Sequence, residues 1–287
     1  QREHNPYVEA FWKWWPELYK SMDTFRITGG EPLLSKDTFK VLDEIIETDN
    51  PNKELKLSIN SNLCVDDKLI DKLIEKAKII INEKRVKEFI LYTSVDTEGK
   101  QAEFIRFGLD YKQLFGNIDK ILTEIPEITI VVMSTFNIFS PFNYEKLIRK
   151  IYDYKVKHFN TTRYWNSPLI LDTSYLRYPD FLSFRLLKGY LSLSYFEKLE
   201  KYMKFFSSYR SLNSYQLQEP TDSGFSLKEI EKITRIKDMF IEDSKSNENF
   251  ELGKKKFKHY IADYKKRRNV DCYETFPELR TFINTIK

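Results

Sequence analysis

Two adjacent glycines and a glutamate follow a short β-rich run near the start of the chain. Residues 24–28 lead directly into Gly29, Gly30 and Glu31. Glycines at a strand end let the backbone approach a ligand closely, and backbone carbonyls beside a carboxylate form a cluster of hydrogen-bond acceptors. Such a cluster suits an ammonium group rather than a phosphate. The alternative is an ordinary strand–helix turn, because glycine commonly marks loops.

Polar side chains also end the next three β-rich runs of the chain. These residues are Asn60, Asn62, Ser94 and Thr135. Their amides and hydroxyls can hydrogen-bond to a ribose or a carboxylate, although each of them alone also suits a cap or a turn. Farther along, the guanidinium of Arg106 can clamp a carboxylate with two hydrogen bonds. Its alternative is an ion pair with Glu103, three residues earlier on the same helix face.

Four β-rich runs, whose starts lie 31, 34 and 39 residues apart, must position these side chains. The runs cover residues 24–28, 55–60, 89–95 and 128–135, with weaker candidates at 157–161 and 168–172. Helix-like apolar stripes separate them at residues 37–46, 66–74 and 143–154, with Ser35 and Asp66 as expected N-caps. This alternation predicts an α/β fold with a mostly parallel sheet, either open or curled into a barrel. Ligands of such sheets bind at the carboxyl ends of the strands.

The composition is that of a globular protein with a sizeable core. The chain has 287 residues, of which 41% are hydrophobic and 31% charged, and this excludes wholesale disorder. No apolar run approaches the ~20 residues that span a bilayer, and the sequence does not open with a signal-peptide pattern. We therefore expect a cytoplasmic protein without a membrane partner. Its two cysteines, Cys64 and Cys272, are too few for a disulfide framework or a four-thiolate metal site.

Positive charge gathers in the second half of the chain, where helical patterns dominate. Residues 180–287 hold 21 Lys and Arg against 16 Asp and Glu, whereas residues 1–179 hold 26 against 27. We therefore place a soft domain boundary near residue 180. The sharpest basic runs are residues 254–258 and 265–268. Such runs indicate either a solvated helix face or a surface that meets nucleic acid or an acidic partner.

The segment Phe25-Arg26-Ile27-Thr28-Gly29-Gly30-Glu31-Pro32-Leu33-Leu34 resembles the Gly-Gly-Glu-Pro segment of radical S-adenosylmethionine (radical SAM) enzymes. Further segments resemble this family's later strand ends and parts of its twitch-domain subgroup, some of whose members are encoded by phages. These segments are residues 60–62, 94–96, 102–111, 135–137, 263–268 and 275–279. The resemblance therefore spans nearly the whole chain.

The resemblance implies a partial (β/α)6 TIM-like barrel over residues 1–179 that lacks its first strand, followed by a mostly helical, basic region over residues 180–287. It also implies that S-adenosylmethionine binds at the strand ends. Gly29, Gly30 and Glu31 would then hold the methionine ammonium, and Arg106 would be the candidate partner of the carboxylate. The candidates for ribose and carboxylate contacts are Asn60, Asn62, Ser94 and Thr135. In active family members a [4Fe–4S] cluster reduces the sulfonium, and the 5′-deoxyadenosyl radical that results abstracts hydrogen from the substrate.

The family's cluster motif, Cys-x3-Cys-x2-Cys, is absent from this sequence. Three thiolates must hold such a cluster to leave one iron open, so we expect no metal site in this chain. The simplest expectation is that an upstream segment carries the first strand and the cluster. The alternative is a cluster-less pseudoenzyme or scaffold protein that completes its barrel with a second chain and contacts nucleic acid through its basic region. The sequence leaves the substrate open among small molecules, peptides and RNA.

Overall fold

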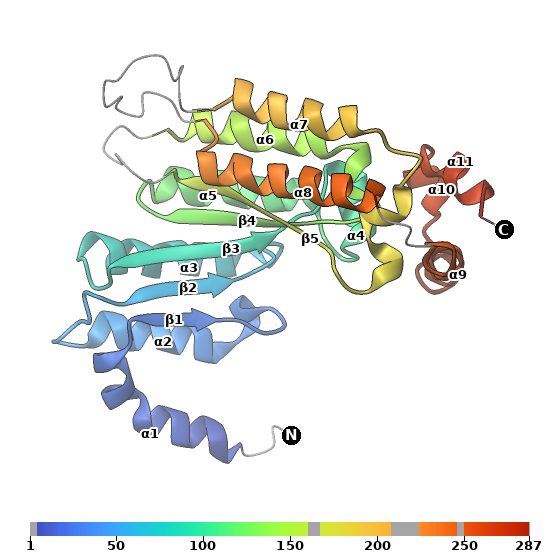
Figure 1. Ribbon diagram of the computed structural model, residues 1–287. Coiled ribbons are helices and arrows are strands. Elements are labelled where there is room, and N and C mark those ends of the chain that lie inside the picture. The colour runs from blue at the N-terminus through green and yellow to red at the C-terminus, as the bar shows by residue number, and fades with distance from the viewer. Residues whose placement is uncertain (1–4, 160–166, 208–223, 246–249, 287) are drawn as a thin grey trace, which may run out of the picture.

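A five-stranded parallel sheet organises the molecule (Figure 1). The computed structural model describes residues 5–159, 167–207, 224–245 and 250–286. The strands are β1 (Thr24–Ile27), β2 (Lys56–Asn60), β3 (Glu88–Ser94), β4 (Thr129–Phe136) and β5 (Leu169–Tyr175), and they pair in that order. Every pairing is parallel, which confirms the α/β prediction.

Each strand follows its sequence neighbour in one direction across the sheet. Because strand–helix–strand crossovers are right-handed, this order places the connecting helices on one face of the sheet. They are α2 (Lys36–Glu47), α3 (Asp67–Asn82), α4 (Gly99–Ile105) with α5 (Tyr111–Glu124), and α6 (Tyr144–Lys157). Figure 1 shows α2 and α3 behind the sheet, with α1 (Pro6–Ser21) beside its β1 end.

Local sequence signals explain where these helices begin. The side chain of Ser35 accepts a hydrogen bond from the backbone N–H of Asp37, and that of Asp66 from the N–H of Lys68. Both residues are therefore N-caps, as expected. The apolar stripe of α3 is buried against the sheet. The prediction of a strand at residues 157–161 is wrong, because α6 continues to Lys157 and His158 forms its C-cap; residues 160 and 161 lie outside the described part.

Alternate residues of each strand divide between two unlike faces. In β3, Phe89, Leu91 and Thr93 are buried on the helix-covered face, whereas Tyr92 and Ser94 on the other face are only half-buried. Parallel sheets normally have both faces covered and read as continuous apolar runs. The second face of this sheet instead mixes polar side chains, such as Arg26 and Asn60, with apolar ones, such as Ile90 and Val131. In Figure 1 no described helix lies in front of β1, β2 or β3. We call it the open face.

The helices after β5 close one edge of the sheet and form a second apolar cluster. Helices α7 (Leu193–Phe205) and α8 (Leu227–Lys245) pack into the same core as the strands. Helices α9 (Glu251–Arg268), α10 (Cys272–Thr275) and α11 (Leu279–Asn284) pack with Phe104 and Phe139 in the other cluster. The boundary near residue 180 stays a prediction.

Short 3-10 turns complete the described structure. They are η1 (Pro32–Leu34), η2 (Ser140–Phe142), η3 (Asp180–Leu182) and η4 (Phe184–Leu187). None of the helices in the described ranges is both long enough and apolar enough to cross a bilayer.

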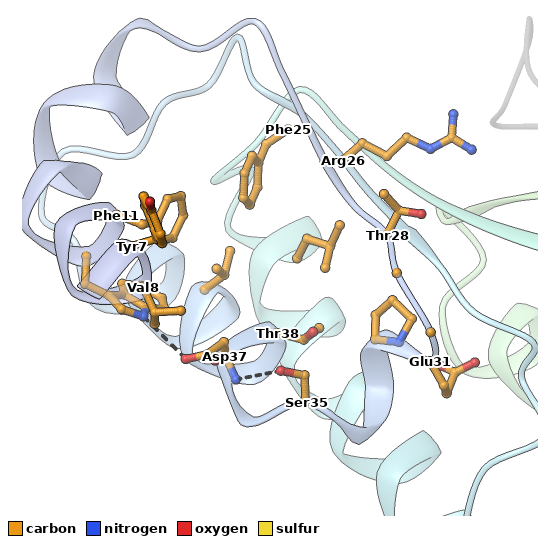
Figure 2. A pocket seen from close by; sticks show the side chains of 16 residues that line it. Tyr7, Val8, Phe11, Phe25, Arg26, Thr28, Glu31, Ser35, Asp37 and Thr38 are labelled. Atoms are coloured by element: carbon orange, nitrogen blue, oxygen red, sulfur yellow. Dashed lines mark hydrogen bonds between the residues drawn. The ribbon is translucent and has the colours of Figure 1, made fainter. Parts of the chain in front are cut away.

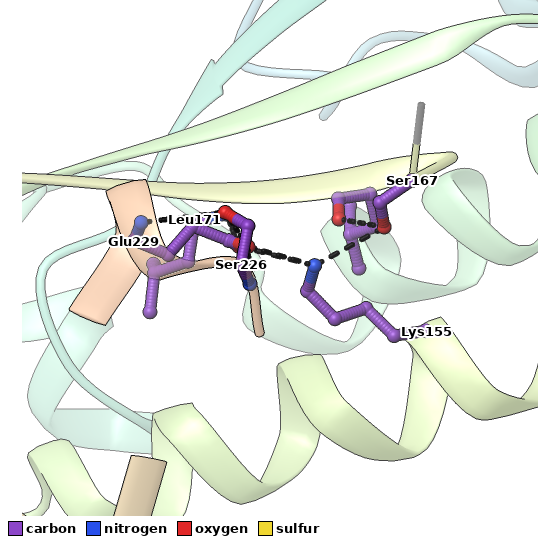
Figure 3. A network of polar contacts seen from close by, with 6 residues as sticks. Lys155, Ser167, Leu171, Ser226 and Glu229 are labelled. Carbon is purple, nitrogen blue, oxygen red and sulfur yellow. Dashed lines mark hydrogen bonds and ion pairs between the residues drawn. The ribbon is translucent and has the colours of Figure 1, made fainter. Parts of the chain in front are cut away.

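A buried ion pair fastens α8 to the outer edge of β5 (Figure 3). The carboxylate of Glu229 accepts a hydrogen bond from the backbone N–H of Leu171 in β5, at 2.8 Å. It also lies 3.1 Å from the ammonium of Lys155, which comes from α6. Both side chains are almost fully buried, and burial lowers the pKa of Lys155. A glutamate of α8 therefore satisfies a backbone donor that an edge strand would otherwise leave unpaired.

Candidate functional site

The turn after β1 is held in shape by Glu31. One carboxylate oxygen accepts a hydrogen bond from the N–H of Leu33, at 3.1 Å, and the other accepts one from the N–H of Asn62, at 2.8 Å. The first contact caps η1, and the second joins the ends of β1 and β2. Gly29 has φ +144°, a conformation that a residue with a Cβ rarely adopts. The carboxylate of Glu31 is therefore fixed by two backbone donors, next to the two glycines.

The carbonyls of this turn are available to a ligand. Gly29 and Gly30 are exposed, and within the described residues no backbone donor is bonded to either carbonyl. Each oxygen of Glu31 accepts one hydrogen bond from the described residues and has room for another, since a carboxylate offers about four acceptor sites. The turn therefore presents several acceptors at one point of the sheet edge.

Asn62 acts as a turn residue in this structure. Its side-chain oxygen accepts a hydrogen bond from the N–H of Cys64, at 2.8 Å, and the next residue, Leu63, has φ +54°. A buried leucine in this left-handed conformation is uncommon, and the side chain of Asn117 donates to its carbonyl, at 2.7 Å. The side-chain amide of Asn62 remains exposed to a ligand, but its oxygen already has a partner.

Arg26 lies on the open face and binds the predicted site residue Asn60. The sequence analysis did not identify Arg26 as a candidate. Its Nε donates a hydrogen bond to the side-chain oxygen of Asn60, at 2.9 Å. Its guanidinium lies 4.0 Å from the ring centroid of Tyr92, and its Nη2 is 3.8 Å from the sulfur of Met133. One side chain of β1 thus spans the open faces of β2, β3 and β4. In the sequence, only its position three residues before Gly29 could have pointed to Arg26 as a site residue.

Arg106 does not stand free to clamp a carboxylate, because Asp96 already holds it. Its Nε lies 2.9 Å from one oxygen of Asp96, and its Nη2 donates to the other, at 3.2 Å. The same carboxylate accepts a hydrogen bond from the N–H of Thr135, at 2.7 Å. No ion pair between Arg106 and Glu103 is found within the described residues, and Glu103 accepts from the N–H of Tyr111 instead. The sequence places Asp96 at the end of β3, but the spacing of the residues does not predict that it pairs with Arg106.

The predicted residues therefore form two groups along the carboxyl edge of the sheet. Glu31, with Gly29 and Gly30, lies over the ends of β1 and β2 with Asn60 and Asn62. Thr135 joins Arg106 through Asp96 over β3 and β4. Ser94 is half-buried on the open face, and no hydrogen bond of its side chain is found within the described residues.

A cleft of about 490 Å³ lies beside the first group (Figure 2). Its lining includes Phe11 of α1, Phe25 of β1 and the turn at Gly29 and Gly30. Figure 2 shows Phe25 on the side of α1, whereas Arg26 points away from that helix. The cleft lies between α1, α2 and β1, and β1 is an edge strand that pairs with β2 on one side only.

The two cysteines do not come together. Cys64 lies near the carbonyl of Asp110, and Cys272 is buried in the second apolar cluster. Burial raises the pKa of both thiols, that of Cys272 to about 12, so the thiolate that a metal requires is disfavoured. Within the described ranges, no three His, Cys, Asp or Glu side chains gather as metal ligands. The residues present therefore do not fit an iron–sulfur cluster.

Comparisons with protein-family models, with curated proteins and with solved structures find no match to this chain. The site must therefore be interpreted from its own geometry.

Proposed function

We propose that the carboxyl edge of this sheet binds S-adenosylmethionine, and that the protein is of the radical SAM type. The observation that carries the proposal is the turn of Gly29, Gly30 and Glu31, where a fixed carboxylate sits beside unbonded carbonyls. An ammonium donates three hydrogen bonds and accepts none, so it matches this set of acceptors. The methionine ammonium is the part of the ligand that this turn would hold.

The remaining contacts differ from those that the resemblance implies. Arg106 is paired with Asp96, so the ligand's carboxylate would have to compete with a buried carboxylate for it. Within the described residues, the side-chain amide of Asn62 and the hydroxyls of Ser94 and Thr135 donate no hydrogen bond. They are therefore better placed than Arg106 as partners of the ribose or the carboxylate. This chain would therefore bind and orient the ligand mainly through the β1–β2 group.

Radical chemistry would need a cluster that these described residues do not hold. In the proposed class, that cluster supplies the electron that cleaves the sulfonium. The chain's own contribution is limited to binding the ligand and presenting it at the open face. Iron content and release of 5′-deoxyadenosine, measured on the anaerobically isolated natural protein, separate an enzyme from the alternative, a cluster-less binding or scaffold protein.

The unpaired edge of β1 supports the barrel part of the proposal. Within the described residues the sheet has five strands and is open, and the cleft lies against β1, the edge strand to which a further strand would add. A strand from another segment or from a second chain would use the free backbone groups of β1. The sheet would then extend from β1 in the direction that a (β/α)6 barrel requires.

The substitution Glu31→Gln tests the ammonium site. We expect it to weaken S-adenosylmethionine binding by roughly 1.5–3 kcal/mol, the scale of a hydrogen bond to a charged group, measured by calorimetry. Binding of methylthioadenosine, which lacks the amino-acid part, should not change. Glu103→Gln is the matched control, because Glu103 is also half-buried and also accepts from backbone, although from one N–H rather than two. If the wild-type protein binds neither compound, or if both variants behave alike, the proposal is wrong.

A further inference from the structure

The open face carries a positively charged group that no carboxylate of the described residues neutralises. Arg26 is exposed, and its partners among the described residues are the amide oxygen of Asn60, the ring of Tyr92 and the sulfur of Met133. All three partners are uncharged. A guanidinium has five N–H donors, so most of the donors of its two Nη atoms lack an oxygen partner within the described part of the chain.

The contacts of Arg26 fix the plane of its guanidinium. The ring of Tyr92 sets the orientation by stacking, and the bond to Asn60 sets the rotation about the side chain. An arginine held in this way loses less rotamer entropy when it binds, and its fork matches the two oxygens of a carboxylate or a phosphate. The side chain is therefore prepared for an oxyanion before any ligand arrives.

The other charges that face this surface do not cancel Arg26. Asp172 of β5 lies in register with Met133, and it is paired with Lys232 of α8. Glu88 begins β3, at the opposite, amino end of the face. Glu31 is at the carboxyl edge, where two backbone N–H groups bind it. The middle of the open face is therefore net positive.

The position of Arg26 on the sheet points to a substrate. A parallel sheet is rarely left bare on one face. On this face a row of side chains runs from Arg26, which is exposed, across Asn60, Tyr92 and Met133, which are half-buried. The row begins beside the turn proposed to hold S-adenosylmethionine: Arg26 binds Asn60, and Glu31 binds the backbone of Asn62, two residues farther on. Two residues span at most ~7 Å of chain, so the two anchor points on β2 are neighbours.

We propose that the open face binds the substrate through an oxyanion, a phosphate or a carboxylate, that is held by Arg26. This inference rests on the proposed function for its location beside the adenosylmethionine site, and it assigns a chemical class to the substrate that the sequence left open. Asn60 and Tyr92 are positioning residues, since they act through Arg26.

Calorimetric titration with inorganic pyrophosphate and, separately, with succinate tests the proposal at low ionic strength. We expect at least one of them to bind the wild-type chain, and the preferred one identifies phosphate or carboxylate as the recognised group. Arg26→Met should weaken that binding by about tenfold or more, as expected for the loss of a charged hydrogen-bond partner. Tyr92→Leu should weaken it less, because the charge stays while its orientation is lost.

Arg177→Met is the matched control. Arg177 is also an exposed arginine beside a tyrosine, with its Nη2 3.3 Å from the hydroxyl of Tyr175 and its guanidinium 5.3 Å from that ring. Its substitution should change anion affinity by less than about twofold. Equal losses in the two variants would show binding to net charge only and would overturn the proposal. So would an unchanged affinity in Arg26→Met, or the absence of binding by either anion.

Nitrogen-15 NMR of the arginine Nε–H groups gives a second measurement on folded protein. The Arg26 signal should shift when the preferred anion is added, and the Arg177 signal should not. A shift of Arg26 by S-adenosylmethionine but not by either anion would instead make it a residue of the cofactor site and would overturn the proposal. Anion binding at Arg26 without any adenosylmethionine binding would support this inference while contradicting the proposed function.

Discussion

At the residue scale, Asp96 is the side chain on which the β3–β4 part of the site depends. It is buried, and it accepts from the N–H of Thr135 while pairing with Arg106 through both oxygens. Charged groups with this little exposure are stable only when they are paired and hydrogen-bonded. Asp96 thus links the end of β3, the backbone of β4 and the end of α4.

Removing the cation tests this role. Arg106→Met leaves the Asp96 carboxylate buried with one backbone donor, and we expect the free energy of unfolding to fall by about 2 kcal/mol in urea titrations. The value lies below the 3–5 kcal/mol typical of fully buried pairs, because 36% of the Arg106 side chain is exposed and water can partly replace it.

The double variant Asp96→Asn with Arg106→Met should recover most of this loss, since an asparagine still accepts from Thr135 without a charge to satisfy. Arg177→Met serves as the control for loss of an exposed arginine. A single variant as stable as the wild type would show that Asp96 is neutralised by something other than Arg106.

Sequence spacing could identify the strand-end residues but not their partners. Glu31 was predicted as an acceptor because its chemistry follows from its own type and from its glycine neighbours. Arg106 was predicted either to clamp the carboxylate of a ligand or to pair with Glu103, three residues earlier. The acid that reaches it is instead ten residues away, at the end of the preceding strand. Side-chain pairing across elements depends on tertiary geometry that no local pattern encodes.

At the element scale, the ion pair between Lys155 and Glu229 fixes the position of α8 against the edge of β5. The contact joins residues 74 positions apart, and Ser226 adds a backbone and a hydroxyl donor to the same carboxylate, at 2.8 and 2.9 Å. The strands and the caps of α2 and α3 follow from local signals, so they were predictable. The packing position of α8 was not predictable, because hydrophobic contacts are non-directional and its apolar stripe could pack against other apolar surfaces equally well.

A double-mutant cycle on Lys155 and Glu229 can test whether this buried ion pair contributes to stability. Lys155→Met removes the cation and leaves a buried carboxylate, so the free energy of unfolding should fall by about 3 kcal/mol or more. Adding Glu229→Gln should restore much of that loss, because the amide oxygen can still accept from Leu171 while no charge remains to be neutralised.

Arg149→Met is the matched control on the same helix. Arg149 pairs with Asp153 at the surface, where both side chains are more than half exposed, and we expect no measurable change in stability. If the double variant is less stable than Lys155→Met alone, the two residues do not act as a coupled pair, and the docking of α8 must depend on its apolar contacts.

At the scale of the whole molecule, the basic runs of α9 are largely engaged by the protein itself. Lys254, Lys256 and Lys265 pair with acidic side chains, and Lys258 donates to the carbonyl of Ile286. The guanidinium of Arg268 lies 4.1 Å from the ring of Phe107. Cations in the last turn of a helix are also stabilised by its dipole. The arrangement therefore favours a solvated helix face over a nucleic-acid surface.

Lys266 and Arg267 are the exposed cations of that last turn for which neither an ion pair nor a ring contact is found within the described residues. They are therefore the side chains to test. We expect the wild-type chain and the double variant Lys266→Gln, Arg267→Gln to show the same weak affinity for a uridine oligonucleotide of about 20 residues, measured by fluorescence anisotropy between 50 and 200 mM salt. Binding of a single strand through its phosphates releases counterions, so each lost phosphate contact reduces the magnitude of the slope of log affinity against log salt by ~0.7.

A slope whose magnitude falls by about 1.4 in the double variant would contradict this expectation, because it would show that the two side chains bind phosphates. The net positive charge of residues 180–287 would then belong to an RNA-binding surface beside the sheet rather than to solubility alone.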